Sequence, residues 1–197
     1  MSTVRILVFC GANCGDDPVY AEAATRLGEV LVEKEIGLVY GAGDVGLMGV
    51  VADAVLAGGG EVIGVIPQTL VDREVAHDGL TELHVVETMH QRKQMMYNLA
   101  DATLSMPGGI GTLDEFFESL TWNQLGYLKA PCGLLNVAGY FDPLLSMLDG
   151  MVAKGFLRQD TRDLVHTESQ PEALVDRVLA SRTGGAKWPV GGPLQDA

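Results

Sequence analysis

The feature that most constrains the fold of this chain is a repeated passage from a short apolar run, through a loop, into a longer amphipathic segment. Such runs are typical of parallel strands buried on both faces, and the segments between them are typical of helices that cover a sheet. The sequence therefore predicts an α/β fold with a parallel sheet wrapped by helices. The predicted strands are 4–10, 36–40, 61–66, 83–86, 102–106, 132–137 and 163–167. The predicted helices are 18–34, 46–57, 87–100, 112–126, 140–153 and 171–181.

Length and charge limit the domain count and the partners. The chain has 197 residues, of which 47% are hydrophobic, and this fits one well-buried domain, expected to span 1–182. The remaining stretch, 183–197, is rich in glycine and proline and is expected to be a flexible tail. A formal net charge of -13 repels nucleic acid and anionic membranes at long range. We therefore expect a small-molecule partner, because a helix N-terminus with one or two cations can still bind a small anion locally.

The cysteines and histidines favour a reduced, metal-free protein. Cys10, Cys14 and Cys132 are odd in number and form no Cys-x-x-Cys pair, which disfavours both a disulfide framework and a zinc site. Neither a signal-peptide core nor a bilayer-spanning apolar stretch is present in the sequence, so we expect a cytoplasmic protein. The four histidines lack metal-ligand spacing, and the sequence shows no Ser-His-Asp or Cys-His pattern typical of nucleophilic catalysis. We expect chemistry that needs no metal and no cofactor.

Three junctions between a predicted strand and the next helix are rich in glycine: 10–15, 41–49 and 107–112. Ligands of open α/β sheets bind outside the carboxyl ends of the strands, so all three junctions are expected to line one crevice. Glycine lets backbone amides approach a phosphate closely, and the following helix offers unpaired N–H groups. The second junction matches a dinucleotide fingerprint, but the acidic residue that would bind the ribose is missing after the next strand, so a purely structural turn remains the alternative there.

The third junction leads into a helix with several acidic residues. Thr112 is predicted to be the N-cap, with Glu115 as its capping-box partner. Asp114 and Glu118 are interpreted as first-turn acids that the helix dipole stabilises without any function. Glu115 is expected to lie one helical turn from the glycine-rich junction 107–112. There the helix dipole favours the ionised carboxylate that a general base or a cation stabiliser needs.

The preceding helix carries Arg92 and Lys93 near its N-terminus, where the helix dipole disfavours positive charge. Their position indicates a compensating anion, with a solvated helix face as the alternative, which fits Lys93 better than Arg92. The polar segment 68–80 follows a strand without an obvious helix, and such excursions often form lids in compact α/β domains. We therefore treat 68–80 as a candidate lid.

Two strings of residues carry a resemblance to a known family. One is Pro107-Gly108-Gly109-Ile110-Gly111-Thr112-Leu113-Asp114-Glu115, continued by Thr121-Trp122-x-Gln124-Leu125-Gly126, and the other is Met89-His90-x-Arg92-Lys93. They resemble the signatures of the LOG (Lonely Guy) family, with the family's spacing between the arginine and the glutamate. Further matches at Gly46-Leu47-Met48-Gly49 and Val8-Phe9-Cys10-Gly11 extend the resemblance over most of the chain.

The resemblance implies a Rossmann-like three-layer sandwich, a homodimer, and cleavage of N6-modified adenosine 5′-monophosphates or AMP into the free base and ribose 5-phosphate. Arg92 and Glu115 take the family's catalytic positions. Glu74, another matched position, lies in the candidate lid. The implied substrate-binding residues are Asn13, Gly43, Glu74, Lys93, Gly108, Gly109, Ile110, Gly111, Thr112 and Thr121.

Two departures from the family pattern concern the first two glycine-rich junctions. Ala12-Asn13 stands where relatives commonly carry two serines, and Ala42 stands where they commonly carry glycine. Asn13 can still donate a hydrogen bond, and Ala42 is expected to add a methyl group near a phosphate. We expect an altered substrate preference with activity retained.

Two alternative functions use the same phosphate loop. A non-catalytic nucleotide or cofactor carrier would need only the loop, and the pair Arg92 and Glu115 disfavours it. An amino-acid decarboxylase, a label often given to this family, would need a lysine that holds pyridoxal phosphate. No lysine lies in a motif that suggests that role.

Overall fold

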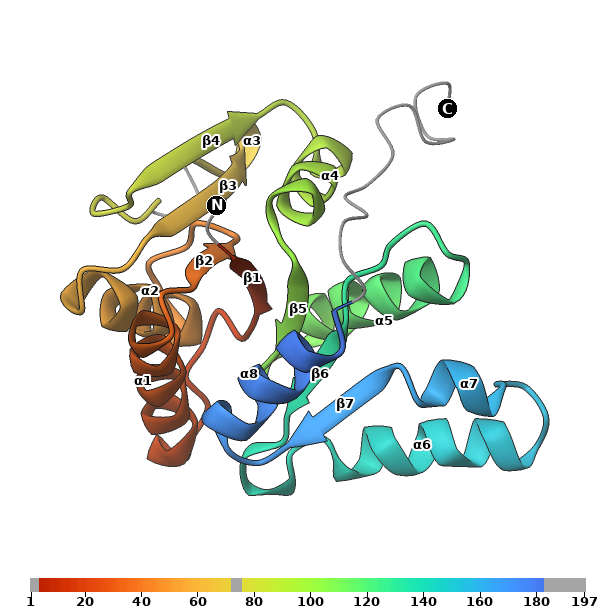
Figure 1. The fold of residues 1–197 in the computed structure, drawn as a ribbon. Coiled ribbons are helices and arrows are strands. Elements are labelled where there is room, and N and C mark those ends of the chain that lie inside the picture. Colours follow the sequence, from red (N-terminus) through yellow and green to blue (C-terminus); the bar gives the residue numbers. More distant parts are fainter. Residues whose placement is uncertain (1–3, 72–75, 183–197) are drawn as a thin grey trace.

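The computed structural model of this chain describes residues 4–71 and 76–182. Within them, seven strands form one sheet in which all neighbouring strands run parallel, in the order β4-β3-β2-β1-β5-β6-β7 (Figure 1). All seven predicted strands are confirmed, with small shifts at their ends. They are β1 (Arg5–Phe9), β2 (Gly37–Tyr40), β3 (Val62–Pro67), β4 (Glu82–Val86), β5 (Ala102–Ser105), β6 (Cys132–Leu135) and β7 (Val165–Glu168).

Four of the interior strands are buried along their whole length. Every residue of β2, β3, β5 and β6 is buried. Helices cover both faces of these strands, so successive side chains on either face must be apolar or small. The edge strand β4 differs, because Glu82, Leu83 and Val85 are exposed. The continuous apolar runs in the sequence therefore correspond to the middle of the sheet.

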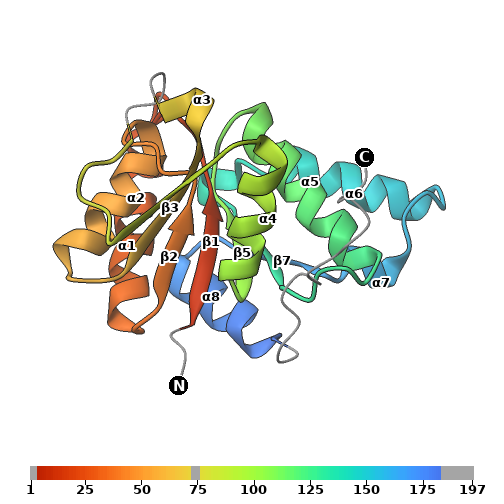
Figure 2. The same ribbon diagram turned by 90° about the horizontal axis from the view of Figure 1, so that it is seen from above.

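The helices form two layers around the sheet (Figure 2). Helices α1, α2 and α8 pack on one face, and α4, α5 and α6 cover the other. This arrangement confirms the predicted three-layer α/β sandwich. The helices are α1 (Pro18–Glu33), α2 (Gly46–Ala57), α3 (Gln68–Val71), α4 (Met89–Leu99), α5 (Ile110–Gln124), α6 (Asp142–Ala153), α7 (Gln159–Arg162) and α8 (Pro171–Ala180).

Two short helices differ from the sequence prediction. Helix α3 forms within the segment 68–80, which was expected to have no helix, and α7 lies between α6 and β7. Each is a single turn, and a single turn is too short to display a helical pattern of apolar residues. The predicted tail, 183–197, lies outside the described residues.

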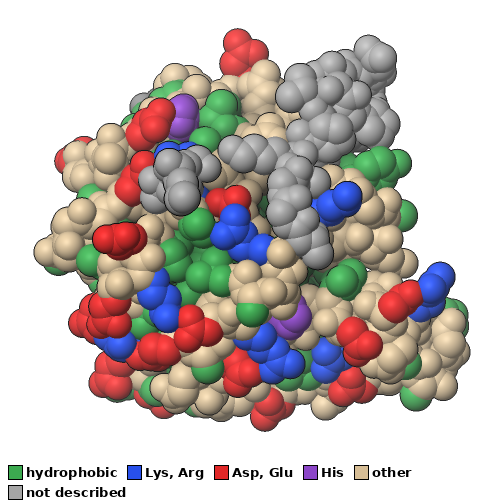
Figure 3. Space-filling model, viewed as in Figure 1, with side chains coloured by type: hydrophobic (Ala, Val, Ile, Leu, Met, Phe, Trp, Pro, Cys, Tyr) green, Lys and Arg blue, Asp and Glu red, His purple; other side chains and the backbone are tan. Residues whose placement is uncertain are grey.

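Charged side chains of both signs are interspersed over α1 and α8 (Figure 3). Arg26 of α1 pairs with Glu172 of α8, and Lys34 pairs with Asp176. Exposed ion pairs of this kind each contribute little to the stability of the fold. Across the described ranges, no helix has the length and apolar character needed to cross a membrane.

The strand order reverses at the centre of the sheet. From β1 the chain proceeds through β2 and β3 to β4 on one side, and then returns to β5, which pairs with the other side of β1. The loops after β1 and β5 therefore lead to helices on opposite faces of the sheet. A crevice opens at such a switch point, and ligands of α/β proteins bind there.

Gly28 provides a test of the packing between α1 and α2. A Cβ added at Gly28 would lie 2.5 Å from the Cβ of Ala54, so Gly28→Ala should force the helices apart. We expect the free energy of unfolding to fall by roughly 1–2 kcal/mol, after allowing for the better helix propensity of alanine. Equilibrium unfolding in urea measures the change. The matched control is Gly150→Ala in α6, where an added Cβ meets open space and should not destabilise. Equal stability of the two variants would contradict this packing.

Candidate active site

A cavity of about 380 Å³ lies at the switch point between β1 and β5. Leu47 and Met48, which belong to the second glycine-rich junction, line it together with the loops after β1 and β5. The expectation that all three junctions meet at one crevice is therefore confirmed. The lining residues among those described are Cys10, Gly11, Ala12, Asn13, Cys14, Gly15, Tyr20, Leu47, Met48, Arg92, Pro107, Gly108, Gly109, Gly111, Thr112, Glu115 and Tyr140.

Backbone hydrogen bonds join the three junctions. The N–H of Gly11 donates to the carbonyl of Pro107 at 3.1 Å, and the N–H of Leu47 donates to the carbonyl of Gly11 at 3.0 Å. Gly46 has a φ of +60°, and an added Cβ would overlap the backbone of Ala12. Glycine is therefore required at Gly46 both by its conformation and by the close approach of the first loop.

Helix α5 begins earlier than the sequence indicated. Gly109 is the N-cap, with no side-chain cap, and Ile110 is the first helical residue. Thr112 is thus inside the first turn and buried, and the predicted Thr112–Glu115 capping box is wrong. The glycine-rich backbone can turn into the helix without a capping side chain, which moves the helix start into the loop. The first amides of α5 have no intrahelical acceptor, and they lie at the cavity.

Arg92 is a buried cation held by main-chain carbonyls. Its Nε donates to Val65 O at 3.0 Å and its Nη2 donates to Gly41 O at 2.9 Å. A Cβ at Gly41 would overlap Nη2, so Arg92 requires glycine there. Its Nη1 makes a long contact of 3.9 Å with Met89 Sδ. Arg92 lines the cavity with only 8% of its surface exposed. The positive charge near the start of α4 is therefore fixed in place by β3 and by the residue that directly follows β2.

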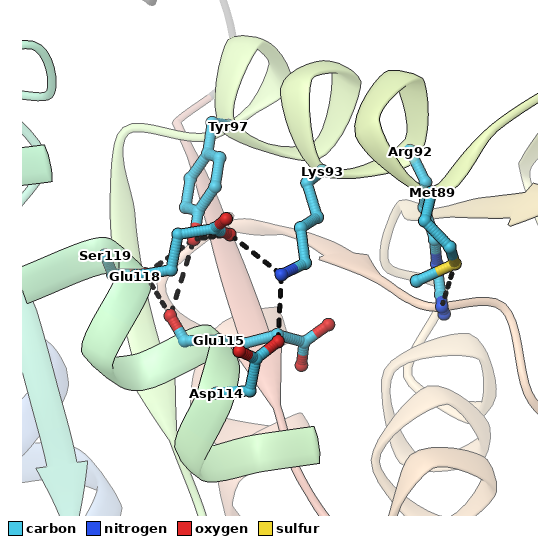
Figure 4. Close-up of polar contacts among 8 residues, drawn as sticks. All are labelled: Met89, Arg92, Lys93, Tyr97, Asp114, Glu115, Glu118 and Ser119. Carbon is cyan, nitrogen blue, oxygen red and sulfur yellow. Dashed lines mark hydrogen bonds and ion pairs between the residues drawn. The ribbon is translucent and has the colours of Figure 1, made fainter.

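Glu115 extends from α5 toward the side of the site where Arg92 lies (Figure 4). Burial raises the pKa of this half-buried carboxyl to about 7, and the positive charges of Arg92 and Lys93 act against that increase. The expectation that the helix dipole keeps Glu115 ionised is wrong, because removal from water is the larger effect here. At neutral pH Glu115 exchanges between its protonated and ionised forms.

Lys93 connects α4 to α5 (Figure 4). Its Nζ lies 2.9 Å from Asp114 Oδ2 and 3.2 Å from Glu118 Oε2. These ion pairs supply the compensating anion expected for Lys93, and they raise its pKa against the effect of burial. Because α5 begins at Ile110, neither acid is in its first turn, and the interpretation of Asp114 and Glu118 as first-turn acids is wrong.

Hydrogen bonds from Tyr97 and Ser119 fix the turn of α5 that carries Glu115 (Figure 4). Ser119 Oγ donates to the carbonyl of Glu115 at 2.8 Å, and Tyr97 Oη lies 2.9 Å from Ser119 Oγ. Tyr97 is a buried residue of α4. The backbone that carries Glu115 is therefore joined both to Arg92's own helix and to the next turn of α5.

The structure divides the predicted site residues into two sets. Seven of them line the cavity: Asn13, Arg92, Gly108, Gly109, Gly111, Thr112 and Glu115. Gly43, Lys93, Ile110 and Thr121 are not among its described lining residues. Gly43 forms a bridge with Ala76, while Ile110 and Thr121 are exposed on α5. Glu74 lies outside the described residues.

Ala42 does not lie where the sequence suggested. It is fully buried, and a Cβ added at Gly64 of β3 would lie 2.7 Å from its methyl group. The expectation of a methyl group near a phosphate is therefore wrong. Ala42 also has a φ of +66°, a left-handed conformation that glycine adopts more easily. The departure from the family's glycine thus adds backbone strain beneath the loop.

Several lining residues were not predicted. Tyr20 at the start of α1 and Tyr140 after β6 form an aromatic wall, with ring centroids 5.9 Å apart. Cys14 is exposed in the same cavity. Tyr140 could have been found by inspecting every strand's carboxyl end, since β6 pairs with β5. No glycine-rich motif marks that junction as strongly as the other three.

Comparison with known proteins gives the family. A family model described as possible lysine decarboxylase matches residues 48–178. The cytokinin riboside 5′-monophosphate phosphoribohydrolase LOG of Oryza sativa subsp. japonica is 48% identical over 87% of this chain and 71% of its own length. The chain belongs to the LOG family. Another member, LOG7 of Arabidopsis thaliana, carries the same enzyme name and is 48% identical over 87% of this chain and 79% of its own.

Solved structures share the fold of this LOG-family chain at lower identity. A molybdenum cofactor binding protein from Rippkaea orientalis has a TM-score of 0.69 at 22% identity, covering 91% of this chain and 98% of its own. The molybdenum cofactor carrier protein of Chlamydomonas reinhardtii has a TM-score of 0.69 at 19% identity, covering 91% and 99%. These similarities concern the α/β architecture alone.

The raised pKa of Glu115 predicts a pH-dependent effect on stability. Glu115 binds its proton more tightly in the folded chain than in the unfolded chain, so its ionisation lowers the free energy of unfolding as pH rises from about 4.5 to about 7. Glu115→Gln removes this cost. Allowing for partial exposure of the carboxyl, we expect the variant to exceed the wild type by roughly 1–3 kcal/mol at pH 8 and to match it at pH 4.

Urea unfolding of both proteins at the two pH values measures this difference. The matched control is Glu35→Gln, which changes an exposed carboxylate between α1 and β2. A constant offset between Glu115→Gln and the wild type at both pH values would contradict the burial of the Glu115 charge.

Proposed function

We propose that this LOG-family chain hydrolyses the N-glycosidic bond of adenosine-type nucleoside 5′-monophosphates, including N6-modified ones, to the free base and ribose 5-phosphate. Relatives that are 45–48% identical carry the name of this reaction. The observation that supports it most directly is the meeting of Arg92 and Glu115 in one cavity with the free amides of α5. A fixed cation, a titratable carboxyl and an anion-binding helix start are the groups this hydrolysis needs.

The 5′-phosphate is assigned to the start of α5. The amides of Gly109 to Thr112 lie at the positive end of a helix dipole and are free of intrahelical acceptors. A Cβ at Gly109 or Gly111 would meet nothing within 4 Å, so the space beside the loop is open to a ligand. Local binding of this kind is compatible with the net charge of -13, because the amides act over a short range.

Glu115 is assigned to the sugar. As the bond from C1′ to the base breaks, positive charge builds on the ribose, and an ionised carboxylate beside it stabilises that charge. The same carboxylate accepts a proton from the water that attacks C1′. The leaving base takes up a proton from solvent, and Glu115 then returns its proton to solvent, so that one water molecule is consumed. A pKa of about 7 leaves a large fraction of Glu115 ionised at neutral pH and keeps it basic enough for proton transfer.

Arg92 is assigned to the carboxylate and the ribose. Because Gly41 and Val65 hold two of its nitrogen atoms, its charge cannot move away from the cavity when the substrate binds. Its positive charge favours the ionised form of Glu115, which burial disfavours. Preorganised charge of this kind lowers the barrier without a reorganisation cost during the reaction. Lys93, Glu74 and Thr121 stay as predicted substrate contacts on the strength of the family motif.

The two alternative functions have less support. The molybdenum cofactor binding and carrier proteins share the fold at 19–22% identity, well below the identity to the hydrolases. A pyridoxal-dependent decarboxylase needs a lysine amine free to form a Schiff base. Lys93, on the same helix as Arg92, instead has its ammonium group in two ion pairs.

We also propose that the protein acts as a cytoplasmic homodimer. Leu83 and Val85 on the edge strand β4 and Met89 at the start of α4 are exposed apolar residues that a second copy could cover. All three cysteines are free thiols, as in proteins of a reducing compartment. Sedimentation at micromolar concentration should give twice the 20.9 kDa chain mass, and a single-chain mass contradicts the dimer.

Substitution of the two proposed catalytic residues tests the function. Glu115→Gln and Arg92→Ala should each lower kcat for adenine release from AMP by at least roughly 100-fold, because each removes charge that stabilises the transition state. Chromatographic separation of adenine from AMP measures the rate. Binding of AMP should persist in Glu115→Gln, since the phosphate loop is unchanged.

Matched controls change the same residue types elsewhere. Glu35→Gln and Arg158→Ala alter exposed side chains and should retain wild-type turnover. Wild-type rates of adenine release by Glu115→Gln or Arg92→Ala would overturn the catalytic assignment. No release of free base from any purine 5′-monophosphate by the wild type would overturn the proposed function itself.

A further inference from the structure

Tyr140 contacts the glycine-rich loop 107–112 and is separate from Arg92 and Glu115, to which the chemistry is assigned. It follows β6, whereas the loop follows β5, so the two come from neighbouring carboxyl ends of the sheet. Its hydroxyl group donates to the carbonyl of Gly108 at 2.5 Å. The residue lines the cavity, and its ring packs edge-on against Tyr20 and Phe141. The ring contacts with Tyr20 and Phe141 and the hydrogen bond to Gly108 together fix the position of the Tyr140 side chain.

This hydrogen bond determines the orientation of one peptide unit. No peptide bond in the described chain is cis, so the carbonyl of Gly108 and the N–H of Gly109 point in opposite directions from the same plane. Holding the carbonyl on Tyr140 therefore directs the N–H of Gly109 away from Tyr140. Gly109 is the N-cap of α5, and its amide belongs to the group assigned to the phosphate.

Packing alone does not fix that peptide unit. Gly108 is tightly enclosed, since an added Cβ would overlap Thr112 Oγ1 and lie 2.8 Å from the N of Gly11. Gly109 is open, with nothing within 4 Å of an added Cβ. A glycine whose Cβ position faces open space can change its backbone angles with little steric cost. The bond from Tyr140 supplies the restraint that steric contacts do not.

The turn that carries Tyr140 is strained in a way that presents its side chain. Ala138 has a φ of 50° and Gly139 a φ of 74°, two successive residues in the left-handed region. Asn136 closes the turn, because its Oδ1 accepts from the N–H of Phe141 at 2.7 Å and its Nδ2 donates to Asp142 at 2.7 Å. A non-glycine residue at positive φ costs free energy and persists where the surrounding structure enforces it, often at functional sites.

We propose that Tyr140 is a positioning residue that holds the Gly108–Gly109 peptide so that the N–H of Gly109 faces the 5′-phosphate. The proposal rests on the proposed function for the identity of the ligand. It assigns to Tyr140 no contact with the base or the anomeric carbon. The hydroxyl group acts through the backbone of the loop and determines how tightly the phosphate binds.

The variant Tyr140→Phe tests this role, because it removes the hydroxyl and keeps the ring contacts with Tyr20 and Phe141. We expect KM for AMP and the Kd of ribose 5-phosphate, measured by calorimetry, to rise about tenfold, the effect of one lost hydrogen bond to the loop. We expect kcat to stay within about twofold, because the chemical groups are unchanged. Competitive inhibition by adenosine, which has no phosphate, should be as in the wild type.

The matched control is Tyr127→Phe, the same change at a tyrosine that packs on Trp122 outside the described cavity lining. It should bind AMP and ribose 5-phosphate as the wild type does. An unchanged Kd for ribose 5-phosphate in Tyr140→Phe would overturn the proposal, and so would an equal loss with adenosine, since that indicates direct contact with the nucleoside. The calorimetric test needs no turnover, so its outcome is separate from failure of the proposed hydrolysis.

Discussion

The parallel pairing of β1 with β5 is the contact on which the site depends. It joins strands that lie far apart in the sequence, and the chain leaves them toward opposite faces of the sheet. Their two loops must therefore separate at the carboxyl ends, and the hydrogen bond from Gly11 to Pro107 limits how far. The cavity forms in that space, with α5 starting at its wall and α4 delivering Arg92 from the same side. The glycines are needed because three backbones approach one another there.

The charges at the site are arranged against their intrinsic preferences. Arg92 lies near the positive end of α4, and the main-chain carbonyls of Val65 in β3 and of Gly41, directly after β2, hold it there. Glu115 lies where burial favours its neutral form, while the cations of α4 favour its ionised form. Lys93 neutralises Asp114 and Glu118, which would otherwise repel the Glu115 carboxylate further. Placing these charges close together costs free energy. The packing of the sheet and the hydrogen bonds around Tyr97 offset that free energy.

The sequence predicted most of the fold, because apolar runs and amphipathic segments report burial directly. It identified the three loops and the pair Arg92 and Glu115, since their residue types are unusual for structural positions. It did not predict the start of α5, because glycine makes the turn without a capping side chain. It gave the wrong protonation tendency for Glu115, because desolvation depends on neighbours distant in the chain. Tyr140 was missed because its role depends on a hydrogen bond across 32 residues.

The distribution of the three cysteines has a practical consequence. Cys10 and Cys132 are buried, and burial raises the pKa of both thiols, to about 11 for Cys132, so neither reacts readily. Cys14 is exposed at the mouth of the nucleotide cavity. A maleimide fluorophore will therefore attach at a single position without any engineered mutation. The emission of the attached fluorophore would report ligand binding in the cavity in real time. In the unlabelled protein, the rate at which the Cys14 thiol reacts would report whether the cavity is free of ligand.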